Sequence, residues 1–228
     1  MTRSAEHRAA LTALDPAAWP AYLDEHSGLP GPRGNIELAL VVADLAPPDL
    51  VDELIASGDE YRTFCGVVAL GSRAADPAVL TRLHEHASDG RWRVREAVAM
   101  ALQRYGDRDP AALPPVVLRW ADDPDPLVQR AAAAAICEPR LLTSPETAAV
   151  AVEVCRRATA ALAALPADQR RRSDVRTLRQ GLGYCWSVAV AADPDPGLAA
   201  FDALDTHDPD VAWIVRENLT KKRLARLR

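Results

Sequence analysis

The sequence predicts an all-α protein built from about a dozen short helices. Three observations support this fold class. Asp-Pro pairs and other polar caps recur along the 228 residues, and apolar residues follow them at steps of three or four. Almost no stretch shows the alternation that is typical of strands. Only 5% of the residues are aromatic and alanine is abundant, so helices can approach one another closely.

Asp-Pro and Ser-Pro pairs predict where many of the helices begin. Proline fits the first helical position, and the residue before it can accept hydrogen bonds from the next free N–H groups. These pairs predict helix starts near Pro16, Pro77, Pro110, Pro126, Pro145, Pro196 and Pro209. Other caps and breakers predict helices after Asn35, Pro48, Asp59, Asp89-Gly90 and Asp174. In ADDPDPLVQRAAAAA the first pair ends one helix and the second pair starts the next.

A register of about 34 residues repeats along the chain, as between Val94 and Val128. Periods of about 30 to 50 residues are typical of helical solenoids. We therefore expect one domain over 1–228, with an irregular N-terminal cap at 1–34 and a C-terminal capping helix at 209–228. Six helix pairs are expected, with second helices near 35–46, 59–73, 91–106, 125–137, 173–191 and 209–226.

The repeats share a motif. DGRWRVREAVAMAL, DPDPLVQRAAAAAI and DVAWIVRENL each contain Asp, four residues, Val, then Arg or Gln. In this motif the chain resembles the HEAT-repeat proteins of the armadillo-type superhelix class, of bacterial type, best over 59–137. The resemblance implies an α-α superhelix. It leaves the function open, because such proteins include scaffolds, adaptors and, in one bacterial branch, DNA glycosylases.

Arginines recur at equivalent points of the repeats. Their positions are Arg62, Arg95, Arg176 and Arg216. The favoured interpretation is a structural ladder, in which an Asp at a turn and an Arg of the following helix hold repeats together. Asp89 with Arg95 fits that pairing, and so does Asp210 with Arg216. The alternative is an anion-binding ladder.

The candidate partner-binding residues are polar groups of one helix face together with tryptophans. Arg93, Glu96 and Gln103 are expected to supply polar contacts on that face. Tryptophans beside repeat junctions can anchor a partner, and the candidates are Trp120, Trp186 and Trp213. Trp92, between two arginines, belongs to the same group. The alternative is that these rings fill the gaps that alanine-rich helices leave.

No catalytic, metal or cofactor motif is present in the sequence. His84 and His86 are two residues apart and would point to different sides of a helix. The widely spaced Cys65, Cys137, Cys155 and Cys185 are expected to be reduced packing residues. We therefore expect no catalytic residues, no metal site and no cofactor.

The most favoured function is a non-enzymatic protein-interaction module that presents a concave surface formed by its second helices, with a protein as its partner. The alternative is DNA binding or alkylation repair of the glycosylase type, suggested by Trp120 beside Asp122 and Asp123. The net charge of −5 disfavours nucleic acid. Basic residues at 170–179 and 221–228 are expected to be solvated surface. No transmembrane or secretory segment is apparent, which favours a cytoplasmic protein.

Overall fold

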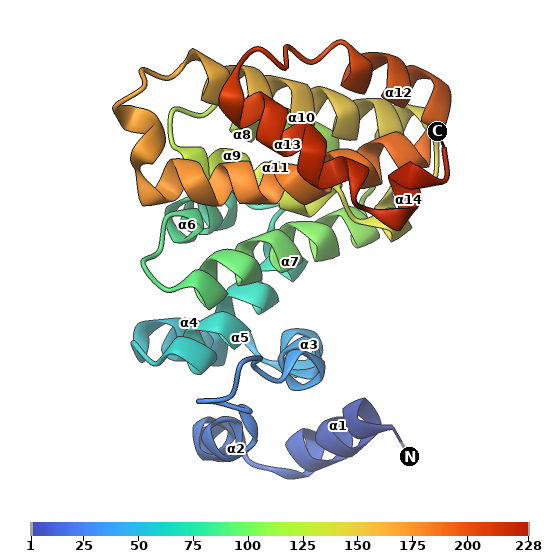
Figure 1. Ribbon diagram of the computed structural model, residues 1–228. Helices are drawn as coiled ribbons and strands as arrows, with labels where there is room; N and C mark the ends of the chain where they lie inside the picture. The colour runs from blue at the N-terminus through green and yellow to red at the C-terminus, as the bar shows by residue number, and fades with distance from the viewer. Residues whose placement is uncertain (1, 228) are drawn as a thin grey trace. The chain divides into compact units, whose positions relative to one another are not determined.

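The computed structural model describes residues 2–227, and these residues form helices joined by short turns, with no strand (Figure 1). The all-α helical-repeat fold is confirmed. The α-helices are α1 (Arg3–Ala13), α2 (Trp19–His26), α3 (Ile36–Leu45), α4 (Pro48–Ala56), α5 (Glu60–Leu70), α6 (Pro77–Ala87), α7 (Trp92–Arg108), α8 (Leu113–Ala121), α9 (Pro126–Ile136), α10 (Pro145–Ala164), α11 (Ser173–Ala192), α12 (Pro194–Asp202), α13 (Pro209–Leu219) and α14 (Lys222–Ala225). The six expected second helices correspond to α3, α5, α7, α9, α11 and α13.

The chain forms two compact units, Met1–Arg108 and Asp109–Arg228. In the first unit α5 is the central helix, because α3, α4 and α7 all pack against it. Helix α1 packs against α3, and α6 packs against α7. The second helices α3, α5 and α7 therefore form a contiguous layer within this unit.

In the second unit the long helix α11 has the same central place. Helices α9, α10, α12 and α13 pack against it, and α14 contacts it as well. Helix α8 packs against α9 and α10. Most core side chains are aliphatic or alanine; Trp186, Trp120 and Phe201 are large aromatic groups buried in this unit.

Polar caps start the helices where the sequence predicts them. The side chains of Asn35, Asp59 and Asp125 accept hydrogen bonds from the first N–H groups of α3, α5 and α9. The same geometry starts α6, α10 and α13. Each cap satisfies N–H groups that have no partner within the helix.

Four helices begin at residues other than those predicted from the sequence. Pro16 begins a 3-10 turn, Pro16–Ala18, and α2 follows it. Asp109 caps only a turn, through the N–H of Ala111 at 3.1 Å, so α8 begins three residues after Pro110. Helix α12 begins at the first proline of its Asp-Pro-Asp-Pro stretch rather than at Pro196. Helix α11 begins one residue before Asp174.

Both ends of the chain differ in detail from the expectation. The segment 1–34, expected to be irregular, contains α1 and α2, because Thr2 caps the first helix and aliphatic Leu11 and Leu23 are buried. The expected terminal helix is divided in two, since α13 ends at Leu219 and α14 begins at Lys222. The capping role of this end remains a prediction.

Two glycines end helices of the first unit. Gly28 follows the last turn of α2 and Gly58 follows α4, and both have a φ of 74°. That left-handed conformation is readily adopted by glycine and strained for other residues. Gly28 thereby starts the loop that leads to α3, which forms one edge of the candidate site.

Candidate functional site

A pocket opens on the second-helix layer of the first unit. It has a volume of about 250 Å³. Its lining comes from the loop before α3 and from α3, α5 and α7, and consists of Arg33, Gly34, Ile36, Phe64, Trp92, Arg93, Glu96 and Met100. Two of its large apolar side chains, Ile36 and Trp92, are each 48% exposed. The pocket is therefore an apolar depression with charged residues around it.

Arg93 is fixed on one side of the pocket. Its Nη1 donates to Oε2 of Glu60 at 3.1 Å, and its Nη2 donates to the backbone carbonyl of Gly31 at 3.1 Å. The guanidinium also lies 4.6 Å from the centre of the Trp92 ring, as a cation–π contact. These contacts connect α7 to α5 and to the loop before α3. Arg93 thus orients the indole of Trp92 at the mouth of the pocket.

The floor of the pocket is rigid. Phe64, which is 5% exposed, stacks on Tyr61 with ring centroids 6.0 Å apart. The Tyr61 hydroxyl donates to the carbonyl of Asn35 at 2.7 Å, and burial raises the pKa of Tyr61 well above its ordinary value. Asn35 in turn caps α3. The first residues of α3 and the aromatic pair on α5 are therefore held together before any ligand arrives.

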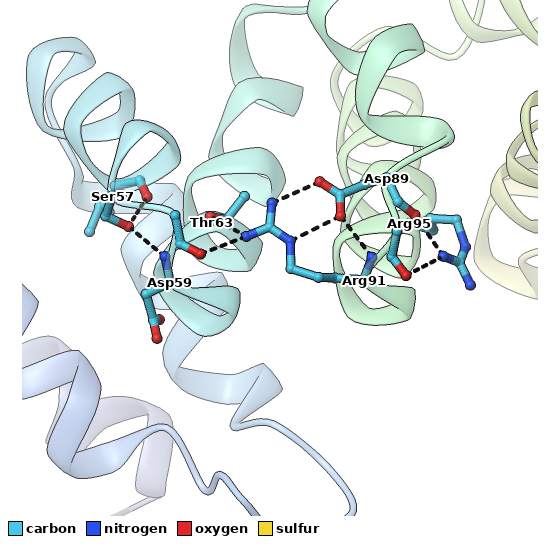
Figure 2. A network of polar contacts seen from close by, with 9 residues as sticks. Ser57, Asp59, Thr63, Asp89, Arg91 and Arg95 are labelled. Atoms are coloured by element: carbon cyan, nitrogen blue, oxygen red, sulfur yellow. Dashed lines mark hydrogen bonds and ion pairs between the residues drawn. The ribbon is translucent and has the colours of Figure 1, made fainter.

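The helix that carries Trp92 is joined to the preceding repeat by the arginine just before it. Arg91 binds the Asp89 carboxylate with Nε at 2.9 Å and Nη2 at 2.7 Å, while its Nη1 donates to the carbonyl of Gly58 at 2.9 Å (Figure 2). A further contact reaches Thr63 at 3.3 Å. Hydrogen bonds from Arg91 hold the pKa of Asp89 below its ordinary value. These contacts of Arg91 connect the α6–α7 turn to the α4–α5 turn.

The two Asp–Arg pairings expected for the arginine ladder, Asp89 with Arg95 and Asp210 with Arg216, are not formed. Arg62 joins α5 to α2 through Asp24, with Nε to Oδ1 at 2.8 Å. Arg95 does not bind the Asp89 carboxylate, because Arg91 already occupies it. Asp210, expected to pair with Arg216, is instead bound by Arg179 at 2.6 Å.

Two of the predicted tryptophan anchors are wrong. Trp186 is completely buried, and its Nε1 donates to Oγ1 of Thr159 at 3.0 Å. Trp120 is 3% exposed. Both rings fill gaps between helices of small residues, which is the alternative that the sequence left open, and neither can contact a partner at the surface.

The other predicted residues lie in three places. Arg93 and Glu96 line the pocket of the first unit, whereas Gln103 lies farther along α7 and is not part of the lining. Trp213, in the second unit, is half-buried against α11, under the guanidinium of Arg179 at 4.7 Å.

The pocket also contains Ile36, Phe64 and Met100, which are not among the candidate residues predicted from the sequence. Trp92, which the sequence groups with the possible tryptophan anchors, lines the pocket as well. The missed signal is that Ile36 follows its cap directly and Trp92 begins α7, so both side chains lie at helix starts on one layer.

The helices from α4 to α9 form three successive pairs, and the sequence of this segment matches the family model of HEAT repeats over residues 47–137. Residues 47–137 are HEAT repeats. Two of the three pocket helices, α5 and α7, belong to these HEAT repeats, and α3 precedes them.

One solved structure extends the likeness of fold beyond the HEAT-repeat match. The chain is similar in fold to AlkD2 from Streptococcus mutans, with a TM-score of 0.67 and 16% identity, over 90% of this chain and 98% of that one. An alignment with the solved structure of an engineered protein covers 100% of this chain and 98% of that one, with 17% identity and a TM-score of 0.38. No curated protein matches the sequence. The likeness to AlkD2 is one of fold.

Across residues 2–227, no three His, Cys, Asp or Glu side chains are grouped so that they could hold a metal ion. None of the described helices combines the length and the apolar character needed to cross a membrane. The four cysteines are reduced and buried, and burial raises the pKa of the Cys65 thiol.

Proposed function

We propose that the protein is a non-enzymatic interaction module and that the pocket on α3, α5 and α7 receives an apolar side chain of a protein partner. The observation that carries this proposal is the exposure of Trp92 and Ile36 around the nearly buried Phe64. Tryptophan in a preformed depression is typical of the few residues that dominate binding energy at protein interfaces.

The size of the pocket favours a side chain over a small-molecule ligand. Its volume of about 250 Å³ is below the range of about 300–1,000 Å³ that is usual for small-molecule sites. An aliphatic or aromatic side chain that enters it removes apolar surface of Trp92 and Ile36 from water. That removal stabilises a complex by about 25 cal/mol for each Å² of apolar surface.

The walls of the pocket reduce the entropic cost of binding. Arg93 is held by Glu60 and by the carbonyl of Gly31, and the Phe64 ring is stacked on Tyr61. A preorganised site loses little side-chain freedom when its partner arrives.

Charged residues at the edge are suited to orienting a peptide. Arg33 is exposed, and Glu96 lies on α7 across the pocket. An apolar centre with a polar rim is the usual arrangement of a protein interface. The two opposite charges favour a partner segment that carries both an acidic and a basic residue near its apolar anchor.

The alternative is DNA binding or alkylation repair of the glycosylase type, and a fold shared with AlkD2 supports it only at the level of architecture. The residues that suggested it have other roles. The Trp120 ring is buried, and Asp122 is paired with Arg157 at 2.6 Å. Asp123 accepts a hydrogen bond from the N–H of Asp125 at 2.9 Å in the turn before α9. Together they do not present an aromatic ring and a carboxylate to a base.

A displayed peptide library tests the proposal directly. Peptides selected on the full chain are expected to carry one large apolar residue, and Trp92→Ala should weaken their binding at least tenfold, as for a central interface tryptophan. Tyr184→Ala is the matched control, because Tyr184 is 47% exposed in the second unit. A mobility-shift assay with duplex DNA forms the second arm.

The outcomes separate the two functions. Peptide binding that depends on Trp92 but not on Tyr184 supports the interaction module. Duplex DNA binding that weakens steeply with salt, together with peptide binding that is indifferent to Trp92, would favour the alternative.

A further inference from the structure

A second depression lies in the second unit. The loop before α11, the first turns of α11 and the turn before α13 line this open depression, whose volume is about 780 Å³. Its lining consists of Ala167, Arg170, Arg171, Arg176, Arg179, His207, Asp208, Pro209 and Asp210. Four arginines thus surround one cavity in a protein whose net charge is −5.

Two of the arginines are neutralised within the fold. Arg170 pairs with Asp208 at 2.5 Å and lies 3.6 Å from Asp210, and Arg179 pairs with Asp210 at 2.6 Å. Although burial alone would raise it, the pKa of Asp208 lies below its ordinary value, because Arg170 and backbone N–H groups stabilise the carboxylate. Both carboxylates are therefore occupied by arginines of the fold.

The other two arginines have no such partner. Arg171 and Arg176 are exposed, and within residues 2–227 neither forms an ion pair or a side-chain hydrogen bond. With four arginines against two carboxylates, the pocket carries a charge of about +2 when His207 is neutral. A dianion matches that charge.

The helix dipoles increase the positive potential. Helix α11 has 20 residues and α13 has 11, and the N-terminal end of each meets the pocket. Arginines near a helix N-terminus are unfavourably placed, because that end carries a partial positive charge. A bound anion would be attracted by both helix ends and by the guanidinium groups.

The scaffold around the free arginines is fixed. Arg170 donates Nε to the carbonyl of Leu165 at 2.8 Å, which ties the loop before α11 to the end of α10. Arg179 lies over the Trp213 ring at 4.7 Å, and its buried Nε has no hydrogen-bond partner. The pocket therefore keeps its shape while Arg171 and Arg176 remain free to move toward a ligand.

We propose that this pocket binds a phosphate dianion, free or as a monoester, through Arg171 and Arg176. The planar fork of a guanidinium donates two parallel hydrogen bonds to an oxyanion, and two such forks can hold three phosphate oxygens. A phosphodiester backbone offers one charge per phosphate and matches the local charge of about +2 less well.

Inorganic phosphate is the probe that tests this proposal. Binding to the full chain is measured by titration calorimetry at pH 8, with potassium chloride at equal ionic strength as the reference. Arg171→Gln combined with Arg176→Gln should weaken phosphate binding at least tenfold and leave the melting temperature in chloride unchanged. The control combines Arg119→Gln with Arg226→Gln, which removes the same charge from exposed arginines of the same unit that lie outside the pocket.

The outcomes decide the proposal. Phosphate binding in the wild type and the control, but not in the Arg171/Arg176 double variant, supports it. Equal binding in all three proteins would overturn it, and so would an absence of binding in the wild type. Duplex DNA binding that depends on Arg171 and Arg176 without phosphate binding would also overturn it, since the pocket would then serve a polymer backbone. Trp92 is not part of this site, so Trp92→Ala should leave phosphate binding unchanged. A negative result for phosphate binding is therefore distinguishable from a negative result for peptide binding.

Discussion

The side chain of Arg95 binds the backbone of Asp89, because Nη1 of Arg95 donates to the carbonyl oxygen of Asp89 at 2.6 Å. Gln129 makes the equivalent contact one repeat later, with Nε2 to the carbonyl of Asp123 at 2.6 Å. The Arg or Gln of the repeated motif therefore closes the turn of its own repeat. In the first unit Arg91, together with Arg93, connects α7 to the preceding repeat.

Replacement of Arg91 with alanine should lower the free energy of unfolding by about 1–2 kcal/mol, because the Gly58 carbonyl loses its donor and Asp89 loses its ion pair. Urea denaturation measures the change. Arg82→Ala is the control, since Arg82 forms only an exposed ion pair with Asp52 at 2.8 Å, worth about 0–1 kcal/mol. Equal losses in the two variants would show that Arg91 is an ordinary surface residue.

Substitution of Gly71 with alanine should destabilise the first unit by about 1–3 kcal/mol through overpacking. A Cβ at Gly71 would lie 2.3 Å from the backbone oxygen of Ala101 on α7, so the helices would have to move apart. Gly90→Ala provides the control, because a Cβ there has no atom within 4 Å. Thermal melting of both variants should show a loss only for Gly71→Ala; similar melting would refute the close contact.

The helix caps and the repeat period could be predicted from the sequence because both depend on residues close together in the chain. Asp125, for example, caps α9 through residues that follow it directly, so its role depends on no distant contact. The shift at Pro110 has a longer-range cause. Asp109 closes a turn there, and α8 begins only where Leu113 becomes buried.

The site residues were harder to predict from the sequence because the exposure of a side chain depends on tertiary packing. The sequence predicts Trp186 as an anchor, yet this ring is wholly buried, whereas Trp92, which lies between two arginines, is 48% exposed. The difference comes from α10 and α12, which cover the face of α11 that carries Trp186. Likewise, the pairing of Arg93 with the carbonyl of Gly31 joins residues 62 apart, which no periodicity indicates.

Acidification should destabilise the protein through His7. The Asn35 amide is oriented by its cap, since its Oδ1 accepts from the N–H of Leu38 at 3.0 Å. Its Nδ2 therefore faces Nε2 of His7 at 3.1 Å, which favours a neutral imidazole with Nδ1 bound to the Tyr22 hydroxyl at 2.8 Å. Burial, and secondly the neighbouring His26, lowers the pKa of His7 from 6.5. Because the folded pKa is below the unfolded value, the unfolded state binds more protons near pH 6.

The neutral imidazole of His7 therefore contributes fully to the stability of the folded state above pH 6.5. This contribution declines as the pH falls through the folded pKa of His7. Melting temperatures measured at pH 7.5 and at pH 5.5 should differ more for the wild type than for His7→Gln. His207→Gln, an exposed histidine of the second unit, should keep the wild-type difference. If His7→Gln shows the full wild-type loss, another group carries the pH dependence.

Asn218 should be among the least replaceable polar residues of the second unit. It is completely buried, its Oδ1 accepts from the N–H of Ser187 at 2.8 Å, and its Nδ2 donates to the carbonyl of Leu182 at 2.9 Å. Asn218→Leu would leave both backbone groups of α11 without these partners and should cost about 2–4 kcal/mol.

Chemical denaturation of Asn218→Leu beside Thr220→Val measures this cost. The Thr220 hydroxyl is exposed and bonds only to Glu217 of its own helix, so its removal should change stability by less than about 0.5 kcal/mol. A loss for Asn218→Leu as small as that for Thr220→Val would mean that α13 is not bound to α11 as described.

The most direct test of the interaction module is fluorine NMR of the protein labelled with 5-fluorotryptophan, titrated with a peptide selected on the wild type. Trp92 is about half exposed in the pocket, whereas Trp19, Trp120 and Trp186 are buried. The resonance assigned through Trp92→Phe should shift with the peptide, and those of the three buried rings should stay in place. Saturable binding with an unmoved Trp92 resonance would contradict the proposal that this pocket receives the partner.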